Sequence, residues 1–483
     1  ASRMAEVLNR VILKAKRGSA PAQINIPRDF WTQVVDIELP SIIEFERPSG
    51  GATAITEAAK LLSNAKFPVI LSGAGVVLAD AIEDCKNIAE KLDAPVACGY
   101  QHNDSFPGKH PLAIGPLGYN GSKAAMEIIS KADVVLALGT RLNPFSTLPG
   151  YGIDYWPKEA KIIQVDFNSD RIGLAKKISV GICGDAKLVA QQILSQLSST
   201  AGDSGREDRK ALIHQTKSAW LQTLTSLDHE EDDEGTTWNK DSRERDPDRM
   251  SPRMAWRAIQ AGLPDDAIIS SDIGNNCAIG NAYPTFEQGR KYLAPGLFGP
   301  CGYGFPSVLG AKIGCPNTPV VGFSGDGAFG ISMSEMTSCS REEWPNITMV
   351  IFRNYQWGAE KRNTTLWYDN NFIGTELDPK LSYAKIAEAC GFKGVKVTTQ
   401  SELTEALKTS CVEQMNFKWL YVMFVYHKMA MFCQIMFCKR QKNWCYQIRS
   451  LKVLICHHWQ TKQRKQIRIW SPIIPVCQKQ VRR

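Results

Sequence analysis

The chain has 483 residues, of which 43% are hydrophobic and 22% are charged. At roughly 150 residues per domain this length suggests about three domains. The composition is that of a folded globular protein and excludes a disordered or fibrous one. No run of about 18 apolar residues occurs, and the start, ASRMAEVLNRVILKAKRG, lacks a signal-peptide pattern. The sequence therefore argues against a membrane-spanning or secreted protein, and no membrane partner is predicted.

The formal net charge of +8 is distributed unevenly along the chain. Residues 416–483 hold 14 Lys and Arg but no Asp, Glu or Gly, whereas residues 1–415 are acidic overall. This abrupt change predicts that the residues after about 415 come from a shifted reading frame or an unspliced segment. A zinc site within residues 433–458 is an alternative, but it lacks the CxxC spacing. A nucleic-acid patch is disfavoured because aromatic residues do not interleave regularly with the cations, so no nucleic-acid partner is predicted.

Cysteine usage bears on the compartment in which the protein works. Nine of the 14 Cys are scattered over residues 1–415 without paired spacing. This pattern is typical of reduced thiols and predicts a cytoplasmic protein.

The first 40 residues are expected to be the end of a domain whose beginning is missing. Apolar residues recur at helical spacing over residues 3–16, and Gly18 and Pro21 end this helix. Residues 22–26 are expected to form a buried strand. One helix and one strand cannot bury a core of their own.

From residue 51 to residue 198, helices alternate with short apolar strands. The strands are expected at residues 68–76, 94–100, 133–142 and 161–167. The same alternation runs from 251 to 415, with strands at 267–272, 318–326 and 347–354. This pattern predicts an α/β fold with parallel sheets. Residues 199–250, which include HEEDDE, show no apolar period and are expected to form a charged linker.

The strongest chemical signal is Gly325-Asp326-Gly327, which ends one apolar strand, with Asn354 at the end of the next. A right-handed crossover would place Asp326 and Asn354 side by side at the edge where parallel sheets bind ligands. The glycines allow a phosphate to approach the backbone, and the two oxygen donors suit Mg²⁺. A plain turn with Asp326 as helix N-cap is the alternative. The spacing and the matching strand favour a metal–diphosphate site.

A weaker glycine signal follows the strand at 68–76. Gly73-Ala74-Gly75 begins a dinucleotide-like fingerprint, but no third Gly follows at the required place. A plain strand-to-loop turn is therefore predicted here, without a ligand.

GDG followed, after a helix and a strand, by Asn resembles the diphosphate–metal motif of thiamine-diphosphate enzymes. Three further segments resemble the acetolactate synthase group of these enzymes: residues 18–30, 106–142 and 297–311. Within that group, four long stretches resemble the sulfoacetaldehyde acetyltransferase family: residues 228–239, 250–264, 270–306 and 352–378. The resemblance covers residues 1–415.

The resemblance implies a domain order, two cofactors and a reaction. Residues 1–40 would be the remnant of a pyrimidine-binding domain, 51–198 a Rossmann-like central domain, and 251–415 a parallel-sheet diphosphate-binding domain. Thiamine diphosphate and Mg²⁺ are the implied cofactors. The implied reaction converts sulfoacetaldehyde and phosphate into acetyl phosphate and sulfite. The alternatives are acetolactate synthase-like carboligation and a non-catalytic protein that binds thiamine diphosphate.

The resemblance also assigns site residues. The metal ligands would be Asp326, Asn354 and the backbone carbonyl of Gln356. The residues expected to line the cofactor are Gly274, Asn275, Asn276, Gly299, Cys301, Gly325, Gly327 and Ala328. Gly299 would accept a hydrogen bond from the cofactor's amino group. Cys301 would be the apolar wedge, where a Met is usual in acetolactate synthases. Lys361 and Arg362 are candidates for binding the substrate anions, with solvated surface charge as the alternative.

One catalytic residue of the superfamily has no match here. A Glu of the pyrimidine-binding domain protonates the cofactor ring, and the site forms between two subunits, so a complete chain is expected to be a homodimer or homotetramer. No residue of this sequence matches that Glu. We therefore expect the chain on its own not to release sulfite at a measurable rate.

Overall fold

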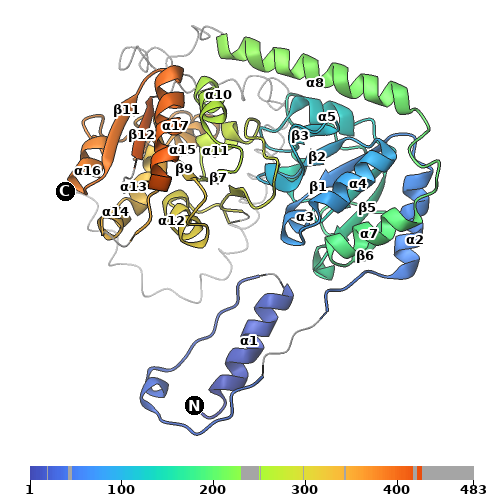
Figure 1. The fold of residues 1–483 in the computed structure, drawn as a ribbon, viewed down its shortest axis with the longest axis horizontal. Helices are drawn as coiled ribbons and strands as arrows, with labels where there is room; N and C mark the ends of the chain where they lie inside the picture. Colours follow the sequence, from blue (N-terminus) through green and yellow to red (C-terminus); the bar gives the residue numbers. More distant parts are fainter. Residues whose placement is uncertain are drawn as a thin grey trace, which may run out of the picture. The chain divides into compact units, whose positions relative to one another are not determined.

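The computed structural model describes residues 1–18, 20–41, 46–229, 250, 252–296, 298–341, 344–416 and 421–426. These residues form two six-stranded parallel sheets with helices packed against them (Figure 1). The acidic stretch HEEDDE and the tail alternatives, including the zinc site, lie outside the described residues. None of the described helices has both the length and the apolar character needed to cross a membrane.

The first sheet has the order β3-β2-β1-β4-β5-β6, and every pairing is parallel. Its strands are β1 (Pro68–Ser72), β2 (Val96–Cys98), β3 (Ala113–Pro116), β4 (Val134–Leu138), β5 (Lys161–Asp166) and β6 (Val180–Cys183). Its helices are α2 (Ala52–Ser63), α3 (Ala74–Leu78), α4 (Ile82–Leu92), α5 (Lys123–Ile129), α6 (Pro144–Thr147) and α7 (Ala186–Gln196). The Rossmann-like order confirms the α/β prediction for this region.

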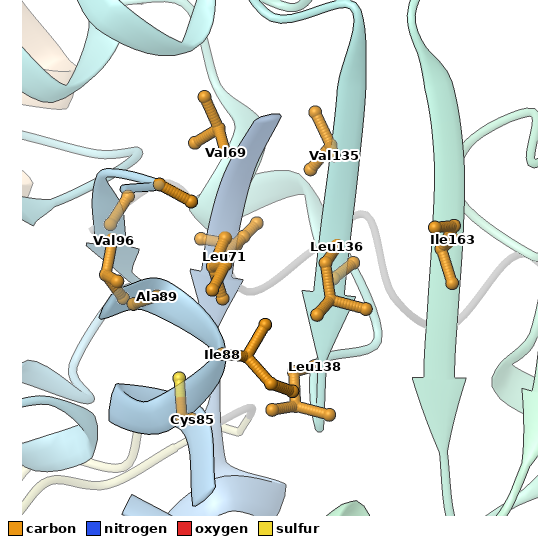
Figure 2. Packing of buried hydrophobic residues seen from close by; sticks show 14 of the residues in the cluster. Val69, Leu71, Cys85, Ile88, Ala89, Val96, Val135, Leu136, Leu138 and Ile163 are labelled. Carbon is orange, nitrogen blue, oxygen red and sulfur yellow. The ribbon is translucent and has the colours of Figure 1, made fainter. Parts of the chain in front are cut away.

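Helices cover both faces of this sheet, and the core lies between the sheet and the helices. Every residue of β1 and β4 is buried, because helices pack on both faces of a parallel sheet. Figure 2 shows how Ile88 of α4 approaches Leu71 of β1 and Leu138 of β4. Buried residues at helical spacing on α4, which include Cys85, Ile88 and Ala89, complete this layer.

The charged stretch after residue 198 differs from the expected linker. It contains helix α8 (Arg206–His229). Ile213, Trp220 and Leu224 are buried along one stripe of this helix, and the Trp220 ring lies edge-on to Tyr151 at 5.3 Å between centroids. The apolar residues of this helix also lie off the buried stripe, as Leu221 does, so they do not indicate a helical period.

The second sheet has the order β11-β12-β10-β9-β7-β8. Its strands are β7 (Ile268–Ser271), β8 (Tyr292–Leu293), β9 (Val320–Gly325), β10 (Thr348–Arg353), β11 (Lys393–Val397) and β12 (Tyr421–Tyr426). Its helices are α10 (Pro252–Gly262), α11 (Asn275–Gly280), α12 (Gly304–Gly314), α13 (Asp326–Ser332), α14 (Glu335–Cys339), α15 (Gly358–Trp367), α16 (Tyr383–Ala389) and α17 (Gln400–Asn416). Strand β12 pairs with both β10 and β11, although it lies beyond the boundary at residue 415 that composition suggested.

A buried tryptophan holds the strands that end at the candidate site. The ring of Trp256, on α10, lies 4.9 Å from that of Phe323 on β9 and 5.7 Å from that of Phe352 on β10. A Cβ at Gly280, on α11, would lie 2.3 Å from the same indole, so only glycine permits this packing. The ends of β9 and β10 are thus fixed by aromatic contacts beneath them.

The N-terminal segment differs from the predicted strand. Helix α1 (Met4–Gly18) forms as expected, and a short 3₁₀ turn follows at Arg28–Thr32. Residues 22–26 form no strand and are not buried. Among the described residues no strand pairs with them, and a strand without a partner leaves its backbone groups unpaired.

Candidate functional site

The parallel pairing of β9 and β10 brings the two predicted metal-binding side chains together. Phe352 is in register with Gly325, so Asp326 and Asn354 follow at the same edge. Asp326 Oδ2 accepts hydrogen bonds from the backbone N–H groups of Asn354 (3.2 Å) and Tyr355 (2.8 Å). Its Oδ1 accepts one from the Gly327 N–H (3.0 Å). The juxtaposition predicted from the crossover is present.

Burial makes the Asp326 carboxylate a strong candidate for cation binding. The residue is 2% exposed, and burial raises the pKa of Asp326 to about 6, although three backbone N–H groups favour the charged form. The Tyr383 hydroxyl donates to the backbone carbonyl of Asp326 at 2.9 Å and so helps to fix the start of α13. A buried carboxylate of this kind is stabilised by a cation beside it.

A cavity of about 180 Å³ opens at this edge of the sheet. All eleven residues predicted from the sequence line it: Gly274, Asn275, Asn276, Gly299, Cys301, Gly325, Asp326, Gly327, Ala328, Asn354 and Gln356. They come from the loops after β7, β9 and β10 and from the segment before α12. The structure therefore gathers the whole predicted set around one hollow.

The polar atoms of the cavity fit a diphosphate. The Asn276 side chain is 4% exposed, and its Nδ2 is buried without a hydrogen-bond partner among the described residues. An unsatisfied buried donor costs about 1–3 kcal/mol, which an anionic oxygen would offset. A Cβ at Gly327 would lie 2.9–3.1 Å from the Trp357 ring, so glycine is required beside that wall.

The oxygen donors of the cavity fit a hard divalent cation. Asp326 offers a carboxylate, Asn354 an amide oxygen and Gln356 a backbone carbonyl, the ligand types that Mg²⁺ takes in proteins. The Gln356 N–H donates to Asn354 Oδ1 at 3.3 Å, and an antiparallel bridge joins Gln356 to Glu376. These contacts hold the segment after β10 beside Asp326.

Cys301 lies where the wedge was expected, at the wall of the cavity. Burial raises the pKa of its thiol, so the side chain is a small neutral group. Gly299, with φ of +63°, precedes it and adopts a conformation that favours glycine. The structure thus places both residues at the cavity, and their roles toward a cofactor stay predictions.

One positioning residue was not singled out in the sequence. Asp272, at the end of β7, is fully buried and accepts hydrogen bonds from the N–H groups of Gly302 (3.0 Å) and Gly304 (2.9 Å). The Ser324 hydroxyl of β9 donates to the same carboxylate at 3.3 Å. Asp272 thereby ties the segment that carries Cys301 to two strands. Its signal in the sequence is an Asp directly after an apolar strand, as for Asp326.

A second cavity, of about 360 Å³, adjoins the first. The two share Ile273, Gly274, Asn275, Gly299 and Ala359 in their linings. Arg362 lines the second cavity. Lys361 instead forms an ion pair with Glu376 and lies over the Phe372 ring, 4.9 Å from its centroid. The structure therefore separates the two cations that the sequence proposed together.

The weaker glycine motif has a packing explanation. A Cβ at Gly73 would lie 2.6 Å from the Gly139 carbonyl oxygen, and one at Gly75 would lie 2.6 Å from the Gly139 Cα. The backbone of Gly75 also donates to the Gly139 carbonyl at 2.8 Å. These contacts let α3 pack against the loop after β4. A third cavity, of about 750 Å³, borders this region.

Comparison with known protein families matches two parts of the chain. Residues 55–193 match the model described as thiamine pyrophosphate enzyme, central domain. Residues 272–418 match the model described as thiamine pyrophosphate enzyme, C-terminal TPP binding domain.

Comparison with curated proteins finds relatives over a range of identities. A probable sulfoacetaldehyde acetyltransferase of Rhizobium meliloti is 76% identical over 413 residues, covering 86% of this chain and 70% of the relative. A sulfoacetaldehyde acetyltransferase of Roseovarius nubinhibens is 73% identical, covering 86% of this chain and 68% of the relative. A probable acetolactate synthase large subunit of Methanocaldococcus jannaschii is 30% identical, covering 80% of this chain and 64% of the relative.

Proposed function

We propose a function on the basis of family: this chain is a thiamine pyrophosphate (thiamine diphosphate) enzyme and belongs to the sulfoacetaldehyde acetyltransferase family. The resemblance stated from the sequence is thereby confirmed. The proposed reaction is the conversion of sulfoacetaldehyde and phosphate into acetyl phosphate and sulfite. The identities of 43–76% to sulfoacetaldehyde acetyltransferases, against 28–30% to acetolactate synthases, favour this reaction over carboligation.

The observation that carries the proposal is the cavity at the ends of β7, β9 and β10. Asp326, Asn354 and the Gln356 carbonyl would hold Mg²⁺, and the amides of Gly327 and Ala328 would face the diphosphate. Asn276, whose Nδ2 has no partner among the described residues, would donate to a diphosphate oxygen. Mg²⁺ would neutralise the buried charge of Asp326 and would also offset negative charge of the diphosphate.

The bound cofactor supplies the carbanion chemistry at its thiazolium ring. The protein's part is to orient and enclose it. Asp272 fixes the segment from Gly302 to Gly304 through backbone hydrogen bonds, and this sets the position of Cys301 as the wedge. The Gly299 carbonyl would receive the amino group of the cofactor. We further propose a homodimer or homotetramer in the cytoplasm; the nine cysteines of the described residues are all free thiols.

A binding titration tests the cofactor site. Tryptophan fluorescence, with Trp357 in the cavity wall, is followed as the full chain is titrated with thiamine diphosphate in Mg²⁺ or in EDTA. Binding is expected only with the metal, and Asp326→Ala is expected to weaken it by more than about 100-fold. Asp166→Ala, which removes a buried carboxylate at the end of β5, is the matched control and should bind normally. Unchanged, metal-independent binding by Asp326→Ala would falsify the site.

A product assay tests the reaction. The chain is incubated with sulfoacetaldehyde, phosphate, Mg²⁺ and cofactor, alone and with the separately expressed N-terminal segment of the Rhizobium meliloti relative. Sulfite and acetyl phosphate are expected in equal amounts in the supplemented mixture. Acetolactate made from pyruvate, without sulfite release, would identify a carboligase instead. Cofactor binding with neither product would identify a non-catalytic binding protein.

A further inference from the structure

We propose that Arg362 and Arg141 bind the sulfonate group of the substrate in the cavity beside the cofactor site. The inference rests on the proposed function and deepens it by naming side chains that hold the substrate. The wall of this cavity includes Gly274, Asn275 and Gly299 of the candidate cofactor site. A small molecule held there would lie next to the cofactor.

The described lining of this cavity is positively charged. Arg141 and Arg362 both line it, and no Asp or Glu lines it among the described residues. His102, also in the wall, adds no charge near neutral pH, because burial and the nearby Arg141 lower its pKa to about 4. A cavity of about 360 Å³ with two guanidinium groups and no carboxylate in its described lining favours an anionic ligand.

Arg362 has the hydrogen-bonding capacity for such a ligand. Its Nη1 donates to the Tyr119 hydroxyl at 2.7 Å, and its Nε is buried without a hydrogen-bond partner among the described residues. A guanidinium has five N–H donors arranged as a planar fork, which suits the oxygens of an oxyanion. An oxyanion in the cavity would satisfy donors that the described protein groups leave unused.

Arg209 is an arginine with a structural role and provides a comparison. This residue is 1% exposed, and its guanidinium donates to five backbone carbonyls at 2.7–3.0 Å. Arg141 also differs from Arg209, because the described residues give its side chain no hydrogen bond and no ion pair within 4.0 Å. The Asp166 carboxylate, which lines the third cavity together with Arg141, attracts it from a longer distance. Arg141 and Arg362 therefore make fewer hydrogen bonds within the described protein than Arg209 does.

The aromatic part of the wall favours an organic sulfonate over inorganic phosphate. The rings of Tyr100, Tyr119 and Phe145 contact one another, with centroids 5.8–6.3 Å apart. Three aromatic rings offer contact for a short carbon body but few hydrogen bonds. A sulfonate presents oxygens at three of its vertices and carbon at the fourth. Phosphate presents oxygen at all four, and each buried oxygen needs a donor.

The test is calorimetric titration of the full chain, loaded with Mg²⁺ and thiamine diphosphate, with 2-hydroxyethanesulfonate. This probe carries the sulfonate but lacks the reactive aldehyde. Arg362→Met is expected to weaken its binding by about 10- to 100-fold, the equivalent of lost charge-assisted hydrogen bonds. Arg141→Met should weaken it in the same direction. Lys361→Met, which removes the neighbouring cation paired with Glu376, is the matched control and should bind the probe normally.

A second variant separates anion binding from a structural link. Tyr119→Phe removes the hydroxyl that Arg362 holds but keeps the guanidinium, so binding should fall by no more than about three-fold. Equal losses in Tyr119→Phe and Arg362→Met would overturn the proposal, because Arg362 would then act only through Tyr119. Binding of inorganic phosphate without any binding of 2-hydroxyethanesulfonate would overturn the choice of ligand. Undiminished binding in Arg362→Met would overturn the assignment itself.

A cofactor titration on the same variants separates this inference from the proposed function. Arg362→Met and wild type are expected to bind thiamine diphosphate equally. Normal cofactor binding without any binding of the sulfonate to wild type would overturn the anion site and leave the proposed function standing. No cofactor binding by wild type would overturn both.

Discussion

The two sheets carry a similar glycine pattern with opposite consequences. Gly73-Ala74-Gly75 follows β1, and Gly325-Asp326-Gly327 ends β9 and begins α13. A Cβ at Gly75 would meet the backbone of Gly139 at 2.6 Å, whereas a Cβ at Gly325 would meet only the Asn276 side chain, at 3.7 Å. The backbone of Gly139 fills the space beside the first pattern, although Gly75 also lines the cavity of about 750 Å³. The space beside Gly325 is open, and this glycine lines the cavity of about 180 Å³. Glycines after a strand therefore indicate a close approach to the backbone, and the packing decides whether protein or ligand makes it.

The largest loss of stability is expected from a substitution of Arg209, whose guanidinium joins several backbone segments in the region of the first sheet. Arg209→Met removes the donor to five backbone carbonyls, in hydrogen bonds that are buried or part-buried. The free energy of unfolding should fall by about 3–5 kcal/mol. Urea unfolding followed by circular dichroism measures it. At low urea the variant should still bind thiamine diphosphate normally; a loss of less than about 1 kcal/mol would contradict the closed packing.

A smaller loss is expected for Gly75→Ala. The new methyl group would lie 2.6 Å from the Gly139 Cα, so either α3 or the loop after β4 must shift. Overpacking of this kind costs about 1–3 kcal/mol. The midpoint of urea unfolding is the measurement. Affinity for thiamine diphosphate should not change, and a selective loss of that affinity would show that the first glycine pattern also serves a ligand.

Protonation of His102 is expected to make the free energy of unfolding depend on pH. Burial and Arg141 lower the pKa of His102 to about 4. As pH falls below about 6.5, the unfolded chain gains a proton at His102 that the folded chain does not take up. The free energy of unfolding should therefore fall by about 2 kcal/mol between pH 7 and pH 5 relative to His102→Gln. The buried carboxylates of Asp272 and Asp326, whose pKa values are raised, act in the opposite sense.

Comparing unfolding curves of wild type and His102→Gln at both pH values isolates the histidine, because the carboxylates are common to both proteins. A parallel fall in the two proteins would show that His102 is protonated in the folded state. The cavity lined by Arg141 and Arg362 would then carry a third charge.

The candidate site was predictable because its residues sit at the ends of strands. Neighbouring parallel strands end at the same edge of a sheet. Because one apolar run ends in Asp326 and the next ends in Asn354, the sequence predicts that these two residues lie close together. Asp272 has the same local signal, but its function depends on the N–H groups of Gly302 and Gly304, whose position no local pattern indicates. The resemblance to thiamine-diphosphate enzymes supplied the remaining lining residues.

Other features depended on packing that the sequence does not display. Lys361 and Arg362 are consecutive on a helix, so their side chains point about 100° apart and meet different partners, Glu376 and Tyr119. Nothing local tells which one reaches a cavity. Strand β12 has an apolar sequence, YVMFVY, but it lies in a stretch whose overall composition argued against a domain. Composition averages over a segment and conceals one strand within it.

The smallest effect on stability, and the most specific one on binding, is expected for Gly325→Ala. Gly325 has φ of −75°, which any residue adopts, and the space around its Cβ position is open. The free energy of unfolding should therefore change by less than about 1 kcal/mol. The added methyl group would border the cavity lined by Asp326 and Asn276, so affinity for thiamine diphosphate should fall by at least about 10-fold. Unfolding curves and the fluorescence titration measure the two quantities on one sample. The reverse outcome, lost stability with intact binding, would mean that the glycines after β9 serve packing, as those after β1 do.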